Sequence, residues 1–226
     1  CSKCKREAIL YQPYSGQHLC REHLVADIEA KAKRTIRQHR GMLPGDHIAV
    51  ILSGNAVENA LLFFLRKLTG KRKDIQVSGI PAGITDDFFA LASRAGATRI
   101  AVATTLDEMS VEILSGILRG DPRACLPGTD DTGETLPTIA PFCYIPSEEI
   151  ARYARIHDLE GRSPLETGDD DSRYSDIKRL LGEYTSRHPA APYAIINLCD
   201  SLKTAGWITS YDGTHPDTEQ LMKKSR

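Results

Sequence analysis

Short apolar runs alternate with amphipathic helical segments from residue 47 onward, and this alternation limits the fold more than any other feature of the sequence. The expected strands cover residues 47–52, 74–81 and 97–105, and the expected helices cover residues 56–68, 85–96 and 106–120. The run HIAVIL at 47–52 is almost entirely apolar, as in a parallel strand that is buried on both faces. Strands and helices in this order predict an α/β fold with a doubly wound parallel sheet.

Polar loops and further helices complete the chain. Residues 140–146 (APFCYIP) predict another short strand. The side chain types predict Thr85 as the N-cap of the second helix and Ser147 as the N-cap of a later one. The acids at 169–171 have two interpretations, a metal site or a solvated loop.

Length and composition limit the number of domains and the classes of partner. The chain has 226 residues, of which 41% are hydrophobic and 26% charged, enough for one α/β domain with a small attachment. The formal net charge of -1 gives no overall attraction to a polyanion, although charge can be concentrated locally. No apolar run is long enough to span a membrane and no secretory signal begins the sequence, so we expect a cytoplasmic protein that does not enter membranes.

Four metal-ligand side chains lie near the start of the sequence as two pairs, Cys1-x-x-Cys4 and Cys20-x-x-His23. This spacing lets each pair form a tight turn and complete a tetrahedron around Zn²⁺. Four protein ligands leave no open position, so the zinc is expected to be structural. The alternative is a set of reduced cysteines without metal, and His18 fits the spacing less well than His23.

A basic amphipathic helix follows the zinc ligands. Its cations are Arg21, Lys31, Lys33, Arg34, Arg37 and Arg40. Two interpretations carry equal weight: the cations stabilise the helix dipole on a solvated face, or they bind nucleic-acid phosphates. We therefore expect a zinc-binding module at 1–25, a basic linker helix at 26–46 and an α/β domain with C-terminal helices at 47–226.

Four segments carry a family resemblance: CSKCKREAILYQPYSGQHLCREHL at the start, IAVILSG at 48–54, ATRIAVATTLDEMSVEILSGILRGD at 97–121 and PFCYIPSEEIARYA at 141–154. In this order they resemble the PP-loop ATP pyrophosphatases of the tRNA 2-thiolation group, the two-thiouridine synthetases. The resemblance covers nearly the whole chain. It implies a nucleotide site after the first strand, tRNA as a partner, and a homodimer or a heteromer with an active family member.

The loop after the first strand departs from that family. The family loop, SGGKDS, wraps pyrophosphate with backbone N–H groups and assists with Lys, Asp and Ser side chains. Here the six residues read SGNAVE, and Glu58 is expected to satisfy the donors that would otherwise hold phosphate. The resemblance implies nucleotide contacts at Ser53, Gly54, Asn55, Thr104, Thr105 and Asp107. We nevertheless expect binding of ATP and Mg²⁺ to be impaired, and we assign no catalytic residue.

Members of this family also carry a Cys-x-x-Cys pair and a later cysteine, which hold an iron–sulfur cluster or handle sulfur. The sequence has no counterpart of that pair. Its other cysteines, Cys125, Cys143 and Cys199, show no ligand spacing. We therefore expect no iron–sulfur cluster and leave the role of these three residues open.

Three functional hypotheses follow. The first is a tRNA-binding or accessory subunit in tRNA modification that has lost its catalytic residues. The second is an active but divergent ATP-dependent tRNA sulfurtransferase that adenylates its substrate. The third is a regulatory or structural protein, which binds nucleotide without turnover or has an empty pocket and recruits a partner through its surface.

Overall fold

A computed structural model describes residues 1–39, 41–83, 86–120, 136–159, 161 and 172–204. Its strands are β1 (Leu10–Gln12), β2 (Gln17–Leu19), β3 (His47–Leu52), β4 (Gln76–Pro81), β5 (Arg99–Ala101) and β6 (Thr138–Ile139). Its helices are α1 (Arg21–Gln38), α2 (Ala56–Thr69), α3 (Phe88–Arg94), α4 (Leu106–Leu118), α5 (Ser147–Ile156), α6 (Ser172–Arg187) and α7 (Ala191–Thr204). Among the described residues, no helix is long and apolar enough to cross a membrane.

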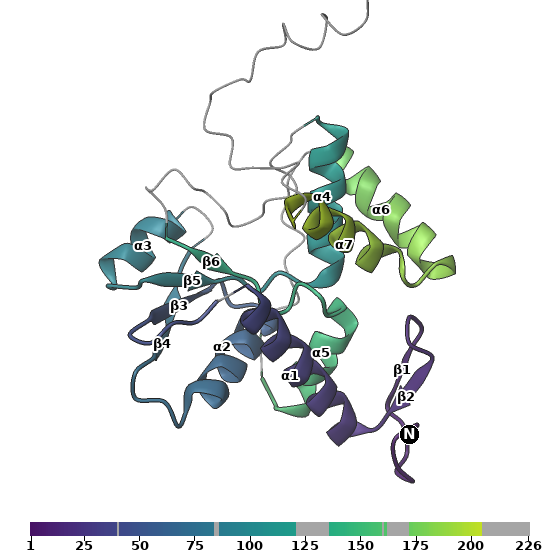
Figure 1. The fold of residues 1–226 in the computed structure, drawn as a ribbon, viewed down its shortest axis with the longest axis horizontal. Helices are drawn as coiled ribbons and strands as arrows, with labels where there is room; N and C mark the ends of the chain where they lie inside the picture. The colour runs from purple at the N-terminus through teal and green to yellow at the C-terminus, as the bar shows by residue number, and fades with distance from the viewer. Residues whose placement is uncertain (40, 84–85, 121–135, 160, 162–171, 205–226) are drawn as a thin grey trace, which may run out of the picture.

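The central sheet has the order β4-β3-β5-β6, and its strand pairs are all parallel. Ile48 and Val50 of β3 are buried in the core that includes residues of α1, α2 and α5. Ala49, between them, is buried in a second cluster with Ala92 of α3. Successive side chains of a strand point to opposite faces, so helices cover both sides of the sheet. Figure 1 shows α3 above the sheet and α2 below it, which confirms the predicted doubly wound α/β fold.

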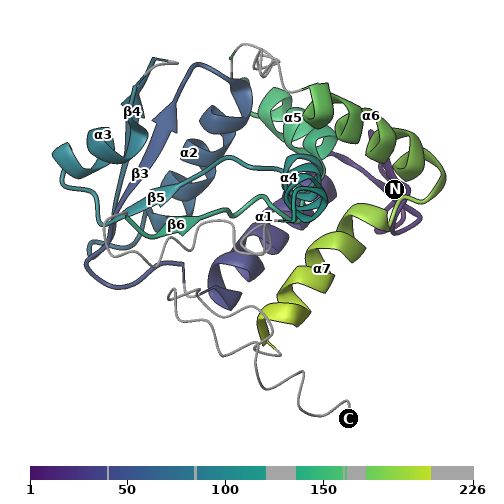
Figure 2. The ribbon, with the colours of Figure 1, turned by 90° about the horizontal axis from the view of Figure 1, so that it is seen from above.

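The C-terminal helices form a separate layer on α4. Leu106, Met109 and Ile113 of α4 are buried in one cluster with Ile196 and Cys199 of α7. Figure 2 shows α6 and α7 beside α4, at the opposite end of the molecule from α3. The layer extends the α/β domain without adding strands to the sheet.

The expected strand at 140–146 is not formed. The backbone turns here instead, with Cys143 N–H donating to the Ala140 carbonyl at 3.2 Å and Ile145 N–H to the Phe142 carbonyl at 2.8 Å. Phe142 and Ile145 are fully buried, so the apolar run reflects core packing rather than strand pairing. The strand lies just before this segment, as β6.

Two helix starts differ from expectation. Thr85, the expected N-cap of the second helix, lies outside the described residues, and Asp87 is the N-cap of α3, its carboxylate accepting a hydrogen bond from Ala90 N–H at 3.0 Å. Ser147 is the first residue of α5 rather than its cap, and its N–H donates to Asp107 Oδ2 at 2.6 Å. In both cases another carboxylate satisfies the free N–H groups of the helix.

A buried polar network joins the N-terminal hairpin to α5. Glu149 is 3% exposed and accepts hydrogen bonds from Gln12 Nε2 at 3.0 Å and from the Tyr14 hydroxyl. Lys31 of α1 lies 3.4 Å from the same carboxylate and 2.7 Å from Asp27. Burial raises the pKa of Glu149 despite the attraction of Lys31. The hairpin is thereby fixed to the α/β domain through α1.

Asp46 supports the start of the sheet. Its carboxylate accepts hydrogen bonds from Leu43 N–H at 2.6 Å, Thr98 Oγ1 at 2.9 Å and Arg99 Nε at 2.9 Å. Burial raises the pKa of Asp46, but these donors outweigh burial and hold the pKa below its usual value of 3.8. Its stabilising effect is therefore complete above the usual pKa and is lost as the pH falls through the folded-state value.

We expect Asp46→Asn to lower the unfolding free energy at pH 7 by about 2 kcal/mol, since charge-assisted hydrogen bonds are lost. The difference from the native protein should shrink as the pH falls from 3.8 through the lower folded-state pKa, where the native carboxylate becomes protonated and loses its charge. Urea denaturation at several pH values measures both effects. Asp74→Asn, at an exposed ion pair with Arg72, is the control and should leave stability nearly unchanged. A difference for Asp46→Asn that is independent of pH would contradict this account.

Candidate functional site

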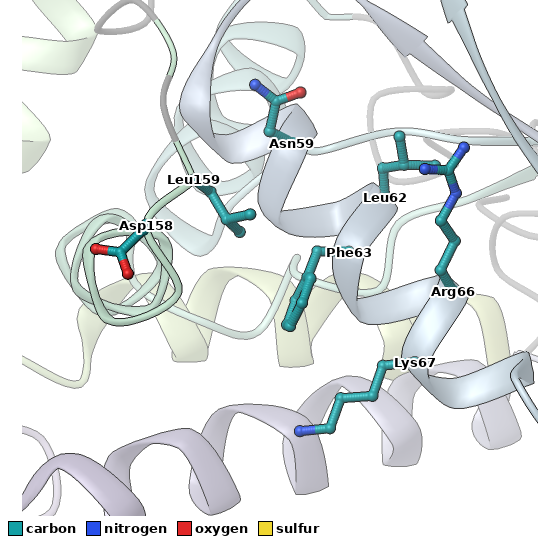
Figure 3. Close-up of a pocket in the computed structure, with 7 residues that line it drawn as sticks. All are labelled: Asn59, Leu62, Phe63, Arg66, Lys67, Asp158 and Leu159. Carbon is teal, nitrogen blue, oxygen red and sulfur yellow. The ribbon is translucent and has the colours of Figure 1, made fainter.

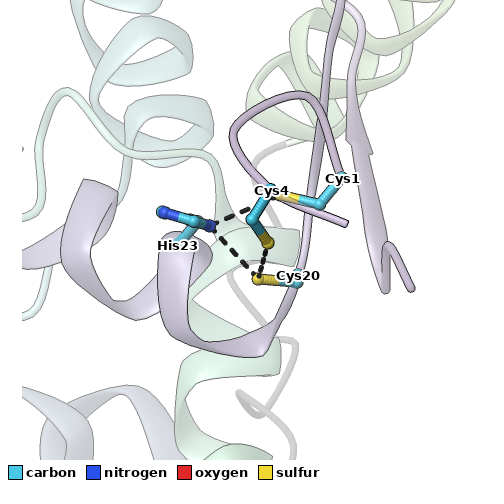
Figure 4. A group of neighbouring side chains, drawn as sticks. All are labelled: Cys1, Cys4, Cys20 and His23. Atoms are coloured by element: carbon cyan, nitrogen blue, oxygen red, sulfur yellow. Dashed lines mark hydrogen bonds between the residues drawn. The ribbon is translucent and has the colours of Figure 1, made fainter. Parts of the chain in front are cut away.

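Cys1, Cys4, Cys20 and His23 lie together at the base of the N-terminal hairpin (Figure 4). Cys4 Sγ is 3.7 Å from Cys20 Sγ, and His23 Nδ1 is 3.4 Å from Cys1 Sγ and 3.3 Å from Cys20 Sγ. A tetrahedron with Zn–S bonds of about 2.3 Å has edges of about 3.8 Å, so these separations fit a Zn²⁺ ion. The four residues can therefore hold a structural zinc.

The loop between β3 and α2 surrounds the carboxylate of Glu58. Glu58 Oε2 accepts hydrogen bonds from Ser53 N–H at 2.6 Å and Asn55 N–H at 3.4 Å. Glu58 Oε1 accepts from Ser53 Oγ at 2.7 Å and from Asn55 Nδ2 at 3.4 Å. Asn55 is the N-cap of α2, and Glu58 completes a capping box with it. The donors of this loop thus converge on an anion that the protein itself supplies.

The backbone of residue 161 lies over the N-terminus of α2. A Cβ atom added to Gly161 would lie 2.6 Å from Ala56 Cα, closer than real Cβ atoms approach. The backbone of residue 161 therefore lies directly against the first residue of α2. Anions bind helix N-termini through free N–H groups, and here that position is approached by backbone.

The second loop expected to contact nucleotide lies at the same edge of the sheet, since β3 and β5 are parallel neighbours. Thr105 is the N-cap of α4, and its N–H and Oγ1 both donate to Glu108 Oε2 at 2.8 Å. Asp107 accepts from Ser147 N–H at 2.6 Å and so holds the start of α5. Thr104 lies between β5 and this cap, partly buried. Like Glu58, Glu108 is the third residue of its helix and serves as a capping carboxylate.

The predicted nucleic-acid contacts of α1 do not share one surface. Lys31 is held in the buried network by Asp27. Arg21 donates from Nη2 to the Ile156 carbonyl at 2.7 Å, at the end of α5. These two cations stabilise packing between helices.

The cations in the second half of α1 are more accessible than Lys31. Lys33 lies 3.5 Å from Glu29 and its side chain is 42% exposed. Arg34 and Arg37 are exposed. Arg40 lies outside the described residues. Arg21 is exposed as well, so Lys31 is the one member of the predicted set in the described part of α1 that the protein holds away from phosphates.

Sequence reasoning missed a second basic segment, at the end of α2. Arg66 and Lys67 are exposed there, followed by three exposed cations at 71–73. Lys67 Nζ is 2.6 Å from Glu29 Oε1, which brings this segment next to α1. The run RKLTGKRK was visible in the sequence, but nothing local connected it to α1.

Comparisons with known proteins agree on one group. Residues 1–25 match the family model described as the N-terminal LIM domain of the 2-thiouridine synthetase TtuA. The tRNA 2-thiolation protein NcsA of Haloferax volcanii is 22% identical, over 87% of this chain and 84% of that protein. The tRNA-5-methyluridine(54) 2-sulfurtransferase of Thermus thermophilus is 35% identical, over 30% of this chain and 21% of that protein.

A solved structure shares the fold of this chain. The U34-tRNA thiolase NcsA from Methanococcus maripaludis superposes with a TM-score of 0.74, over 89% of this chain and 87% of that one. The sequence identity is 15%, so this similarity establishes the fold alone. It also corrects one expectation, because that structure is described with its [4Fe-4S] cluster, and the prediction that an iron–sulfur cluster is unlikely is contradicted.

The expectation of no iron–sulfur cluster rested on the absence of a ligand spacing among the cysteines. Cys143 and Cys199 are far apart in the sequence but are buried in one apolar cluster. Cys199 is disulfide-bonded, and Cys125 lies outside the described residues. Residues distant in sequence can thus lie close together, so the lack of a local ligand spacing did not exclude an iron–sulfur cluster.

The zinc assignment predicts that two nearby histidines respond differently to substitution. His23→Gln should reduce bound zinc from one ion per chain to well below one and lower the melting temperature, because a structural zinc site contributes folding free energy. His18 is exposed and stacks on Tyr11 outside the ligand group, so His18→Gln should retain the metal. Zinc release on thiol oxidation, with a colorimetric chelator, measures the stoichiometry. Equal zinc loss in both variants would contradict the assignment.

Proposed function

Because the chain belongs to the PP-loop tRNA 2-thiolation group, we propose that it acts in tRNA modification as a tRNA-binding accessory subunit that does not use ATP. The observation that carries this proposal is the position of Glu58. Its carboxylate accepts the hydrogen bonds of Ser53 and Asn55, where phosphate oxygens would otherwise be bound.

Glu58 is a strong competitor because it belongs to the same chain. An intramolecular group competes at an effective concentration in the millimolar range or above. A nucleotide must displace this carboxylate and then bind beside its negative charge near the start of the helix. The favourable dipole of α2 is already used by Glu58.

The loop also lacks the groups that would favour phosphate. No Lys or Arg occurs in residues 53–58. Asp107, a possible Mg²⁺ ligand, is engaged with the first N–H of α5. Transfer of an adenylyl group needs positive charge or metal at the pyrophosphate leaving group. The described residues of the two loops place no cation there.

The second candidate is an active, divergent ATP-dependent sulfurtransferase. It is favoured by the names of the relatives, which include a thiolase and a sulfurtransferase. Gly54 also keeps a left-handed backbone, φ 97°, which a tight anion-binding loop uses. A nucleotide-binding regulator without turnover is the third candidate.

An accessory subunit requires partners. We propose tRNA as the first partner and, as the second, either another copy of this chain or an active member of the group. A cytoplasmic location follows from this role, and one relative is itself named a cytoplasmic tRNA 2-thiolation protein.

Calorimetric titration with ATP and Mg²⁺ tests the position of Glu58. We expect the zinc-loaded native protein to bind with a Kd weaker than about 1 mM, and Glu58→Ser to bind at least about tenfold more tightly. Glu108→Ser, which removes the equivalent capping carboxylate of α4, is the matched control. It should lose similar stability without gaining affinity.

Two results would contradict the proposal. Submillimolar binding by the native protein would show that the loop accepts nucleotide despite Glu58. Release of AMP and pyrophosphate in the presence of tRNA would favour the sulfurtransferase instead.

Binding of tRNA tests the second half of the proposal. We expect native affinity for tRNA to fall steeply as salt rises, because phosphate contacts release counterions. The double variant Arg34→Ala and Arg37→Ala should weaken binding and reduce the salt slope by about two. Arg94→Ala with Arg187→Ala, two exposed arginines on α3 and α6, is the control. Fluorescence anisotropy across a salt series gives both quantities, and a slope equal to that of the control would exclude a phosphate-binding role for α1.

A further inference from the structure

We infer that the end of α2 and the adjoining end of α5 form a site for an unpaired nucleotide of an RNA strand. This inference rests on the proposed tRNA-binding function and gives that function a location. The site consists of a pocket between the two helices and a group of cations beside it.

The pocket lies between α2 and the turn that follows α5. It has a volume of about 440 Å³, and its lining includes Asn59, Phe63, Arg66, Lys67, Asp158 and Leu159. Figure 3 shows Phe63 pointing from α2 toward the turn, and Leu159 pointing toward α2 from the other side. Ligand pockets run from about 300 to 1,000 Å³, so this one suits a single small group rather than a duplex.

The turn that forms one wall is fixed by the way α5 ends. Asp158 has φ 53°, and Leu159 N–H donates to the Ala154 carbonyl at 3.0 Å. A left-handed residue followed by a hydrogen bond between residues five apart is typical of the Schellman motif, which ends many helices. The turn is thus held beside α2 by the backbone of α5, and Figure 3 shows the Asp158 carboxylate pointing away from α2.

The chemistry of the lining matches a nucleotide in two respects. Phe63 provides an aromatic surface and is itself supported by His157, with ring centroids 4.6 Å apart. Arg66 and Lys67 provide positive charge for phosphate. Proteins that bind unpaired RNA combine base stacking on aromatic side chains with positive charge along the backbone.

Positive charge extends beyond the pocket onto α1 and the segment after α2. Lys33 and Lys67 both approach Glu29, at 3.5 and 2.6 Å, so two ammonium groups share one carboxylate. Lys71, Arg72 and Lys73 follow in the next turn, and Arg72 pairs with Asp74. The surface therefore keeps a net positive charge after its ion pairs are counted, although the whole chain has a net charge of -1.

Two variants separate the contributions of stacking and charge. Phe63→Leu should weaken binding of an unpaired oligoribonucleotide about tenfold with an unchanged salt slope, because stacking is lost and no charge is. Arg66→Ala with Lys71→Ala and Lys73→Ala should weaken binding of both tRNA and the oligoribonucleotide and lower the salt slope by about three. Phe88→Leu and the Arg94→Ala, Arg187→Ala double variant serve as controls on other faces. Melting temperatures close to the native value verify that each variant is folded.

The outcomes distinguish this site from the broader function. If native protein binds tRNA and all variants bind as the controls do, the site is overturned and the proposed function stands. If native protein binds no RNA, both are overturned. If Phe63→Leu impairs binding of AMP but not of the oligoribonucleotide, the pocket takes a free nucleotide and the inference is overturned. A loss confined to duplex RNA would likewise count against a site for an unpaired nucleotide.

Discussion

The position of β3 between two parallel strands determines most of what surrounds it. Its side chains enter two different cores, with Ile48 and Val50 on one side and Ala49 on the other. The strand therefore tolerates no slip in register, since a shift by one residue would exchange the large and small side chains between the two faces. The fixed strand places Ser53 at the carboxyl edge of the sheet, and the following helix must begin there. The geometry of an anion-binding loop is thus retained by packing, whatever ligand occupies it.

That separation of scaffold from ligand explains how the loop can keep its shape while its chemistry changes. A helix start has free N–H groups that need acceptors, and phosphate or a carboxylate can supply them. Asn55 Oδ1 accepts the N–H groups of Val57 and Glu58, and the Glu58 carboxylate accepts those of Ser53 and Asn55 just before the helix. Together they form a capping box that stabilises α2. Glu108 does the same for α4, so both helices at this edge are capped without a bound anion. The second case shows that internal capping is a consistent property of this edge rather than an isolated contact.

Sequence patterns predicted what depends on nearby residues and missed what depends on distant ones. The parallel sheet and the positions of α2 and α4 followed from periodicity, and the arrangement of Cys1 to His23 followed from spacing. The segment 140–146 was misassigned because a buried turn and a buried strand have the same apolar composition. The contact of Glu149 with Gln12 spans most of the chain, so no local pattern could indicate it. For the same reason, Cys143 and Cys199 gave no signal of lying in one cluster.

Helix α5 connects the separate features of the molecule. Glu149, in its first turn, is bound by the N-terminal hairpin, and the N–H of Ser147 donates to Asp107 in the first turn of α4. At its other end, Asp158 and Leu159 form a wall of the pocket on α2. A helix of this length spans about 15 Å, so the hairpin and the pocket are joined by one rigid element. Because the buried carboxylate of Glu149 needs the donors of the hairpin, the N-terminal hairpin helps to fix the helix that shapes the pocket.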